Sequence, residues 1–432
     1  MHRSILHIAI PSIISNITVP LLGLIDVAIT GHLGSEVYLG AIAVGGMLFN
    51  IVYWMFVFLR MGTSGLTAQA YGRRDFTAVM QLLVQNSSLA AVLSVFMLLL
   101  SPLLFSVSMW LISPSAEVTV FTRQYFQIVI WGAPPSLILS ALNGWFIGMQ
   151  NSRIPMVIAI FQNILNILLS LLFVYSFEME IRGVALGTLL AQWGGLVLAV
   201  VLCWYNYGRL WSSKVWDGLW RRDRLAALFS VNRDIFLRTL CMIVVHFFFV
   251  SAGARLGNVE LAVNTLLMQF FTLFSYFMDG FAFAGEALTG KAIGGGNKTE
   301  LRSTVHNLFV WGVLISVSFT VLYAVAGTSL LSLLTDNASV ADSAMHYRHW
   351  TLLFPLCGMA AFVWDGIYIG ATKTRPMFFS TLGGMIMFIT LFFLLSPSLC
   401  NHGLWIAYLA YLVLRGIVLT ITSKTLYSFK AL

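Results

Sequence analysis

Long stretches without a single charged residue constrain the fold of this chain more than any other feature. Residues 76–116 and 376–414 contain no Asp, Glu, Lys or Arg, and charged residues make up only 9% of the 432 positions, whereas 59% are apolar. A soluble domain carries about 25% charged residues, so the composition excludes a cytosolic enzyme, a disordered chain and a secreted disulfide scaffold. A membrane span needs about 20 apolar residues. The sequence therefore predicts an integral membrane protein with short loops and no sizeable extramembrane domain.

Charge-free intervals along the whole chain mark the expected transmembrane helices, and the longest intervals are split at Pro, Gly and polar clusters. The twelve expected spans are 8–30, 38–66, 79–108, 120–148, 155–177, 183–205, 233–254, 260–288, 303–330, 347–371, 376–396 and 403–424. The predicted fold class is accordingly all-α.

The net charge of +8 is explained by topology. Most Lys and Arg residues fall on one set of loop ends, above all in the Trp-rich segment 206–232, and few fall on the opposite set. By the positive-inside rule, both termini are expected to be cytoplasmic in a multi-pass protein of the cytoplasmic (inner) membrane. A nucleic-acid partner is not needed to explain the charge, and a monomer within membrane lipid is expected.

The two halves of the sequence resemble each other at an offset of 222 residues. Residues 65–72 (GLTAQAYG) match 287–294 (ALTGKAIG), and 143–148 (NGWFIG) match 365–370 (DGIYIG). Because each half holds six spans, the repeat is parallel and its pseudo-two-fold axis lies along the membrane normal. The predicted organisation is an N-terminal six-helix lobe (1–205), a cytoplasmic linker (206–232) and a C-terminal six-helix lobe (233–432). Duplicated bundles are typical of secondary transporters that alternate access, and a duplicated scaffold without transport is the alternative.

Asp26 is the first candidate functional residue. It lies in the outer half of the span 8–30 with no Lys or Arg within ten positions. An ionisable group at membrane depth costs about 2.5–3.5 kcal/mol, and burial favours the neutral form of a carboxyl group. Asp26 is therefore predicted to carry a proton or to ligate a small cation through its oxygens. A neutral, hydrogen-bonded packing residue is the structural alternative.

A polar stripe follows on the span 155–177. Asn163, Asn166 and Ser170 are spaced i, i+3 and i+7, which places them on one helical face, and Thr188 begins the next span. Such stripes often only join helices through hydrogen bonds. Together with Asp26 they predict an oxygen-lined ion-coupling pocket in the N-terminal lobe.

A second ionisable group gathers mainly in the C-terminal half. Its members are Asp279, Glu286, Asp365, Arg60, Arg238 and Arg415. Acids and arginines at matching depth tolerate burial as ion pairs, so a structural or gating network is at least as good an interpretation as a substrate site. Asp365 is favoured for function because its repeat partner, Asn143, carries no charge.

The remaining signals predict no enzyme, metal site or cofactor. Residues 285–292 (GEALTGKA) approach a P-loop, but Ala replaces the Ser or Thr that holds Mg²⁺, and no strand precedes them. His346 and His349 are better interpreted as two histidines at the membrane interface than as metal ligands. The four cysteines are widely spaced, which argues against a disulfide framework or a Cys-x-x-Cys metal site. An ion gradient, of H⁺ or Na⁺, is expected to supply the energy. The Phe- and Met-rich composition suits binding of apolar cations.

Several motifs resemble the multidrug and toxic compound extrusion (MATE) family, and within it the branch named for DNA-damage-inducible protein F. They span nearly the whole chain in family order: 20–26 (PLLGLID), 58–63 (FLRMGT), 65–72, 232–239 (NRDIFLRT), 279–282 (DGFA) and 365–372 (DGIYIGAT). The resemblance implies a V-shaped pair of six-helix lobes and export of cationic or amphiphilic small molecules in exchange for H⁺ or Na⁺.

The resemblance also implies roles for individual residues. Asp26 matches the family's coupling carboxylate, and Pro11 matches a proline at which bending has been proposed. In the family's N-lobe cation site that Asp joins an Asn and an Asp of the fifth helix and a Thr of the sixth. Asn166 and Thr188 match, but Ser170 stands at the position of the second Asp. Because cation affinity rises with ligand charge, this difference favours proton coupling.

Two rival functions follow from other readings of the sequence. A lipid or lipid-linked precursor flippase of the same superfamily is the nearest, although such proteins tend to have extra helices and a cationic central cavity. An integral-membrane enzyme would need a nucleophile or metal cluster at the interface, where only the His346 and His349 pair is available.

Overall fold

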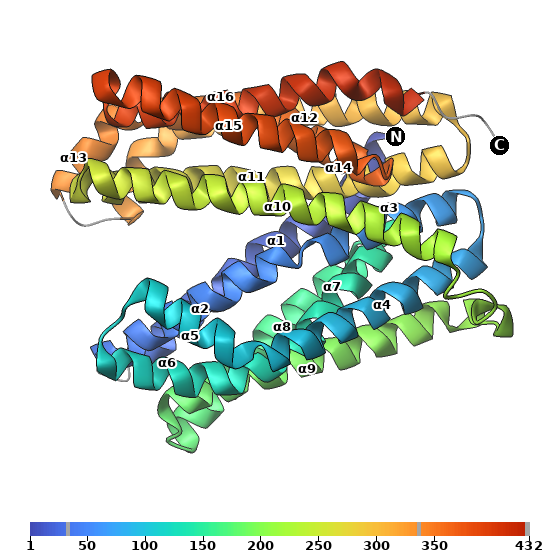
Figure 1. Cartoon of the computed structure of the whole chain (residues 1–432), viewed down its shortest axis with the longest axis horizontal. Coiled ribbons are helices and arrows are strands. Elements are labelled where there is room, and N and C mark those ends of the chain that lie inside the picture. The colour runs from blue at the N-terminus through green and yellow to red at the C-terminus, as the bar shows by residue number, and fades with distance from the viewer. Residues whose placement is uncertain (32–34, 335–337, 428–432) are drawn as a thin grey trace. The chain divides into compact units, whose positions relative to one another are not determined.

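A computed structural model describes residues 1–31, 35–334 and 338–427 of the protein (Figure 1). Within these ranges the chain is almost entirely helical and contains no strand. The α-helices are α1 (His2–Gly31), α2 (Glu36–Met55), α3 (Phe58–Gly72), α4 (Phe76–Leu99), α5 (Ser101–Ile112), α6 (Ala116–Val129), α7 (Ala133–Gly148), α8 (Arg153–Leu171), α9 (Glu180–Tyr207), α10 (Arg222–Leu256), α11 (Asn258–Gly294), α12 (Lys298–Leu334), α13 (Ala338–Tyr347), α14 (His349–Gly370), α15 (Thr374–Leu399) and α16 (Asn401–Thr422). Short 3₁₀ or π turns lie at η1 (Ile130–Gly132), η2 (Leu172–Ser176), η3 (Gly208–Leu210), η4 (Ser213–Val215) and η5 (Ser423–Tyr427).

Twelve helical segments in the described part of the chain are long and apolar enough to cross a membrane. They coincide with the twelve spans predicted from the sequence, so the all-α membrane fold is confirmed. Two span boundaries differ from the predicted ones by more than six residues. The third expected span, 79–108, is broken at Leu100, where Pro102 starts the separate helix α5. The seventh begins at Arg222 instead of 233, because the polar stretch carries buried Leu228 and Val231 on one helical face.

The helices form two compact units. One comprises residues 14–226, and the other combines residues 1–13 with 227–432. Helix α1 therefore contributes to both units. In the second unit its first turns pack on α11, where Gly280 lies against Ile13 and the carbonyl oxygen of Ala9. The Trp311 indole N–H also donates a hydrogen bond to His2 Nδ1 at 3.1 Å.

Matching glycines bring equivalent helices together in each unit. A Cβ on Gly144 of α7 would lie 2.2 Å from the carbonyl oxygen of Arg60 on α3, and a Cβ on Gly366 of α14 would lie 2.2 Å from that of Ala282 on α11. Both pairs are related by the offset of 222 residues found in the sequence. Only glycine allows two helix backbones to approach this closely. The internal repeat is therefore visible in the packing of each unit.

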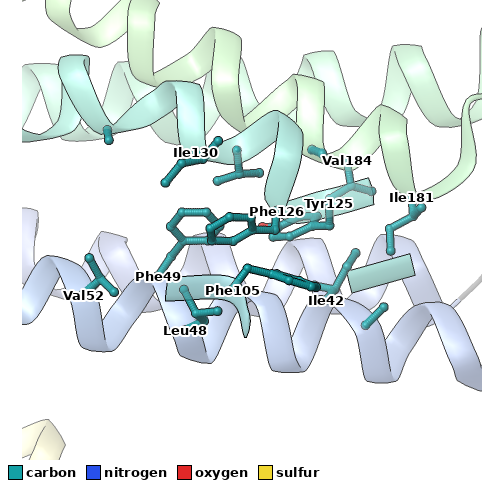
Figure 2. Packing of buried hydrophobic residues seen from close by; sticks show 14 of the residues in the cluster. Ile42, Leu48, Phe49, Val52, Phe105, Tyr125, Phe126, Ile130, Ile181 and Val184 are labelled. Carbon is teal, nitrogen blue, oxygen red and sulfur yellow. The ribbon is translucent and has the colours of Figure 1, made fainter. Parts of the chain in front are cut away.

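An aromatic core joins α2, α5, α6 and α9 within the unit formed by residues 14–226 (Figure 2). The rings of Phe49 and Phe126 stack with centroids 5.3 Å apart, and Phe105 lies at the same distance from Phe126. Tyr125 and Val184 belong to the same cluster. This core forms the apolar surroundings of the polar groups described next.

Candidate functional site

Asp26 is buried inside its unit, with 4% of its surface exposed. The hydroxyl of Thr188, on α9, lies 3.5 Å from Asp26 Oδ2. The side-chain amide of Asn166, on α8, donates a hydrogen bond to the Thr188 hydroxyl oxygen at 3.0 Å. Three of the residues predicted from the sequence therefore form one buried chain, in which Thr188 links the amide to the carboxyl group.

The Thr188 hydroxyl has two acceptors for its single proton. Besides Asp26, it faces the carbonyl oxygen of Val184 at 3.0 Å, within its own helix. A hydroxyl donates only one hydrogen bond at a time. A charged Asp26 attracts the Thr188 proton, because hydrogen bonds to ionised acceptors are the stronger ones. A neutral Asp26 leaves that proton with Val184.

A glycine sets the separation of α8 and α9 beside this chain. A Cβ on Gly187 would lie 2.4 Å from the hydroxyl oxygen of Ser170 and 2.8 Å from its backbone nitrogen. Ser170 is fully buried, which places the third member of the predicted stripe against α9 one turn beyond Asn166. The close approach of the two helices therefore positions Asn166 and Thr188 for their hydrogen bond.

Several buried oxygens of the pocket lack a hydrogen-bond partner in the described part of the chain. Asp26 Oδ1, Asn166 Oδ1 and Ser170 Oγ are buried and have no hydrogen-bond partner within the described ranges. A buried polar atom without a partner costs about 1–3 kcal/mol. A proton on Asp26, or a small cation among these oxygens, supplies the missing positive partner. The donor set thus fits a site for H⁺ or a small cation.

Tyr125, on α6, is a pocket residue that the sequence analysis missed. Its side chain is 5% exposed and interacts with both Thr188 and Asp26. A second tyrosine, Tyr53, lies near Ser136 and Gln192 in the same unit. With 14 tyrosines in the chain, nothing in their spacing singles out these two.

Asn163 does not join the Asp26 pocket. Its amide donates a hydrogen bond to the carbonyl oxygen of Thr18 at 2.7 Å. Thr18 precedes Asp26 by eight residues, which is about 12 Å along a helix. Asn163 therefore joins α8 to α1 at another level. Pro11 lies inside α1, two residues before the contact-based division at Ile13 and Ile14.

In the C-terminal unit, Asp365 is paired with two arginines. Its Oδ2 accepts a hydrogen bond from Arg415 at 2.7 Å and another from Arg238. Arg415 also contacts the Tyr411 hydroxyl at 3.3 Å. The exposed fractions are 4% for each arginine and 7% for Asp365. Removing Asp365 would leave two buried guanidinium groups without the carboxylate that they share.

The other predicted members of this group are not part of the trio. Glu286 is buried on α11, where its carbonyl oxygen lies against Gly370, and Asp279 lies on the same helix near Tyr276. Arg60 belongs to the other unit, where its backbone packs against Gly144.

The discounted sequence signals take ordinary structural positions. Residues 285–292 lie inside α11, so their N–H groups serve the helix instead of cradling a phosphate. His346 and His349 are joined by His402, with ring centroids 5.5 and 5.7 Å from it. Over residues 1–31, 35–334 and 338–427, three or more His, Cys, Asp or Glu side chains nowhere cluster so as to hold a metal ion.

Comparison with known proteins assigns the family. A family model described as MatE matches residues 11–172 and again 235–394, once in each half. The chain belongs to the MATE family. Among its relatives, DNA damage-inducible protein F of Escherichia coli K12 is 35% identical over 422 residues, covering 96% of this chain and 91% of that protein. The family resemblance drawn from the motifs is thereby confirmed, and the chain is a multi-pass membrane transporter.

More distant MATE proteins agree in sequence and fold. Multidrug and toxin extrusion protein 1 of Danio rerio is 24% identical over 429 residues, covering 96% of this chain and 70% of that protein. A crystal structure of MATE in the bent conformation superposes with a TM-score of 0.91 at 19% identity, covering 99% of this chain and 95% of that chain. The Vibrio cholerae MATE transporter VcmN in its bent form gives 0.88 at 17% identity, covering 98% and 96%.

Proposed function

We propose that this MATE protein exports organic cations or amphiphiles in exchange for H⁺, and that Asp26 carries the coupling proton. The observation that carries the proposal is the buried pocket around Asp26, in which the side-chain oxygens Asp26 Oδ1, Asn166 Oδ1 and Ser170 Oγ have no partner in the described chain. Such a pocket favours a protonated carboxyl group, because burial disfavours the charged form and Asp26 Oδ1 has no hydrogen-bond donor within the described ranges.

Protonation changes the hydrogen bonds that connect α1 to α9. When Asp26 is charged, it accepts the Thr188 hydroxyl proton. When Asp26 is neutral, the Thr188 hydroxyl donates to the Val184 carbonyl oxygen and the protonated carboxyl group of Asp26 becomes a donor, so the hydrogen bond between α1 and α9 reverses its direction. An ion can drive the transporter only through different affinities for its two states. We propose that the outward-facing state takes the proton and releases substrate, and that the inward-facing state gives up the proton and binds substrate.

Helix α1 offers a route from Asp26 to the rest of the molecule. Its residues 1–13 pack within the C-terminal unit, whereas residues from Ile14 onward belong to the N-terminal unit. Pro11 stands beside this division and cannot donate the helix hydrogen bond of its position. We therefore propose that α1 changes its bend near Pro11 when the charge of Asp26 changes.

Proton coupling is favoured over Na⁺ coupling by the ligand set. Asp26 is the carboxylate in this pocket, and Ser170 supplies a hydroxyl where the family pattern has a second Asp. A hard cation binds more tightly as the charge of its ligands rises, so a single carboxylate makes a weak Na⁺ site. A cytoplasmic (inner) membrane location with both termini cytoplasmic remains part of this proposal, as do a monomeric state and the absence of a cofactor other than the coupling ion.

Transport into sealed vesicles tests the proposal. The purified protein is reconstituted, and uptake of a labelled organic cation is followed under an imposed pH gradient or an imposed Na⁺ gradient. We expect uptake that responds to the pH gradient and ignores the Na⁺ gradient. Uptake driven by Na⁺ alone would contradict proton coupling. Flipping of a fluorescent lipid in the same vesicles, without cation uptake, would favour the flippase alternative.

A further inference from the structure

An apolar groove opens on the flank of the N-terminal unit, and its first residue on α9, Val200, lies twelve positions after Thr188 of the Asp26 pocket. Its volume is about 430 Å³, and it lies between α4, α7 and α9. Apart from Ser87 and Ser88, its lining is apolar or aromatic. Two rim residues, Val200 and Trp204, are 53% and 68% exposed. In a transmembrane bundle, exposed apolar side chains face lipid, so the groove opens to the bilayer.

The length of the groove matches one leaflet. It follows α4 from Met80 to Ala91, eleven residues and therefore about 16 Å at 1.5 Å per residue. Half of a hydrocarbon core of about 30 Å is about 15 Å. The groove thus has the depth of one acyl chain, starting from the side of the membrane that carries the segment between α9 and α10.

This connecting segment forms the mouth of the groove. Gly208 and Trp211 line the groove, and exposed Arg209 stands between them. Residues 206–222 carry four Arg or Lys side chains against a single acid, Asp217. Trp216 and Trp220 are each 58% exposed. Tryptophan and basic residues together are the composition that proteins place at the level of lipid headgroups.

The mouth is held in place by buried hydrogen bonds. The Gln81 amide donates to the carbonyl oxygens of Val215 and Asp217 at 3.1 and 3.0 Å, and the Gln85 amide donates to that of Leu219. Val215 and Leu219 are 0% and 2% exposed. The basic segment is therefore fixed to α4, the helix that also lines the groove.

We propose that the groove binds one membrane phospholipid with an anionic headgroup, whose acyl chain lies along α4 and whose phosphate is held by Arg209 and Lys214. The excess of positive charge at the mouth favours an anionic headgroup, and the length of the groove accommodates one acyl chain of the lipid. The proposal is independent of the proton-coupled export proposed above, because it requires no transport.

Native mass spectrometry of the full-length protein in detergent tests the headgroup. The protein is titrated with phosphatidylglycerol or with phosphatidylcholine of identical acyl chains. We expect preferential binding of phosphatidylglycerol. In the double variant Arg209→Gln/Lys214→Gln we expect its affinity to fall roughly 25-fold, since each basic residue near an anionic surface contributes about fivefold. The matched control is Arg123→Gln/Arg182→Gln, which removes two exposed charges of the same unit near the start of α9, whereas the groove lies along the last turns of that helix.

A pair of tryptophan substitutions tests the groove. Ala91→Trp fills its deep end, whereas Val92→Trp changes the adjacent position, which is 66% exposed. We expect Ala91→Trp, and not Val92→Trp, to abolish selective binding while both variants keep the wild-type melting temperature. Equal binding of the two lipids to the wild type would overturn the proposal. So would an equal loss in the control double variant, or undiminished selectivity in Ala91→Trp.

Discussion

Gly187→Ala is the sharpest test of how the pocket is positioned, because it changes no polar group. Gly187 precedes Thr188 on α9 and lies against Ser170 on α8. The added Cβ would lie 2.8 Å from the Ser170 backbone nitrogen and 3.0 Å from its Cα. The serine hydroxyl can rotate away, but the backbone atoms of α8 cannot. The two helices must therefore separate.

The size of this separation follows from the contact distances. A comfortable contact between heavy atoms begins at about 3.5 Å, so α9 must move by about 0.7 Å. The hydrogen bond from Asn166 to Thr188, now 3.0 Å, would lengthen to about 3.7 Å, beyond the useful range. Overpacking costs about 2 kcal/mol and the lost hydrogen bond about 1 kcal/mol. Replacing glycine in a helix returns about 1 kcal/mol, which leaves a net loss of about 2 kcal/mol.

Melting in detergent and transport in vesicles measure the effect. Gly46→Ala is the matched control, because no atom lies within 4 Å of its added Cβ. We expect Gly187→Ala to melt at a lower temperature than Gly46→Ala and to export substrate more slowly under the same pH gradient. If both variants were equally stable and equally active, the close approach of α8 and α9 would not position Asn166 and Thr188.

Three other substitutions test the C-terminal unit and the connecting segment. Gly366→Ala places a Cβ 2.2 Å from a backbone oxygen of α11 and should lower the free energy of unfolding by about 3 kcal/mol. The control is Gly383→Ala, because no atom lies within 4 Å of its added Cβ. Equal melting temperatures of the two variants would refute the close packing. Asp365→Ala leaves two guanidinium groups buried without their shared carboxylate and should lower the free energy of unfolding by about 3–5 kcal/mol. A variant as stable as the wild type would show that the trio does not contribute to stability. Gln85→Leu removes the amide that holds Leu219, so limited proteolysis should cut residues 211–221 faster, and an unchanged rate would contradict that anchoring.

The sequence was sufficient for the architecture because membrane spans follow from uninterrupted apolar stretches. Long apolar stretches, divided at Pro, Gly and polar clusters, locate all twelve spans. The repeat of NGWFIG in DGIYIG contains Gly144 and Gly366, which make equivalent contacts in the two units. The two larger boundary differences arise from local chemistry that span counting ignores. Pro102 starts a new helix inside an apolar stretch, and the polar start of α10 is helical because its buried leucine and valine share a face.

The pocket was only partly predictable, because spacing shows which residues share a helical face and not how far along a neighbouring helix they lie. Asn166 and Thr188 meet at Asp26, whereas Asn163, on the same predicted stripe, reaches the Thr18 carbonyl group instead. Tyr125 was missed because an aromatic residue in an aromatic-rich chain has no distinguishing pattern. The pairing of Asp365 with two arginines requires three helices at a known register, which a single sequence does not provide.

The most direct test of the central claim is to measure proton movement during transport in the wild type and in the Asp26→Asn variant. The protein is reconstituted in vesicles that contain a pH-sensitive dye, and substrate is added on one side. The wild type should move protons when substrate is added. Asp26→Asn should bind substrate and move none, whereas Glu117→Gln, which removes an exposed acid outside the pocket, should behave like the wild type. Substrate-dependent proton movement at the wild-type rate in Asp26→Asn would contradict the account.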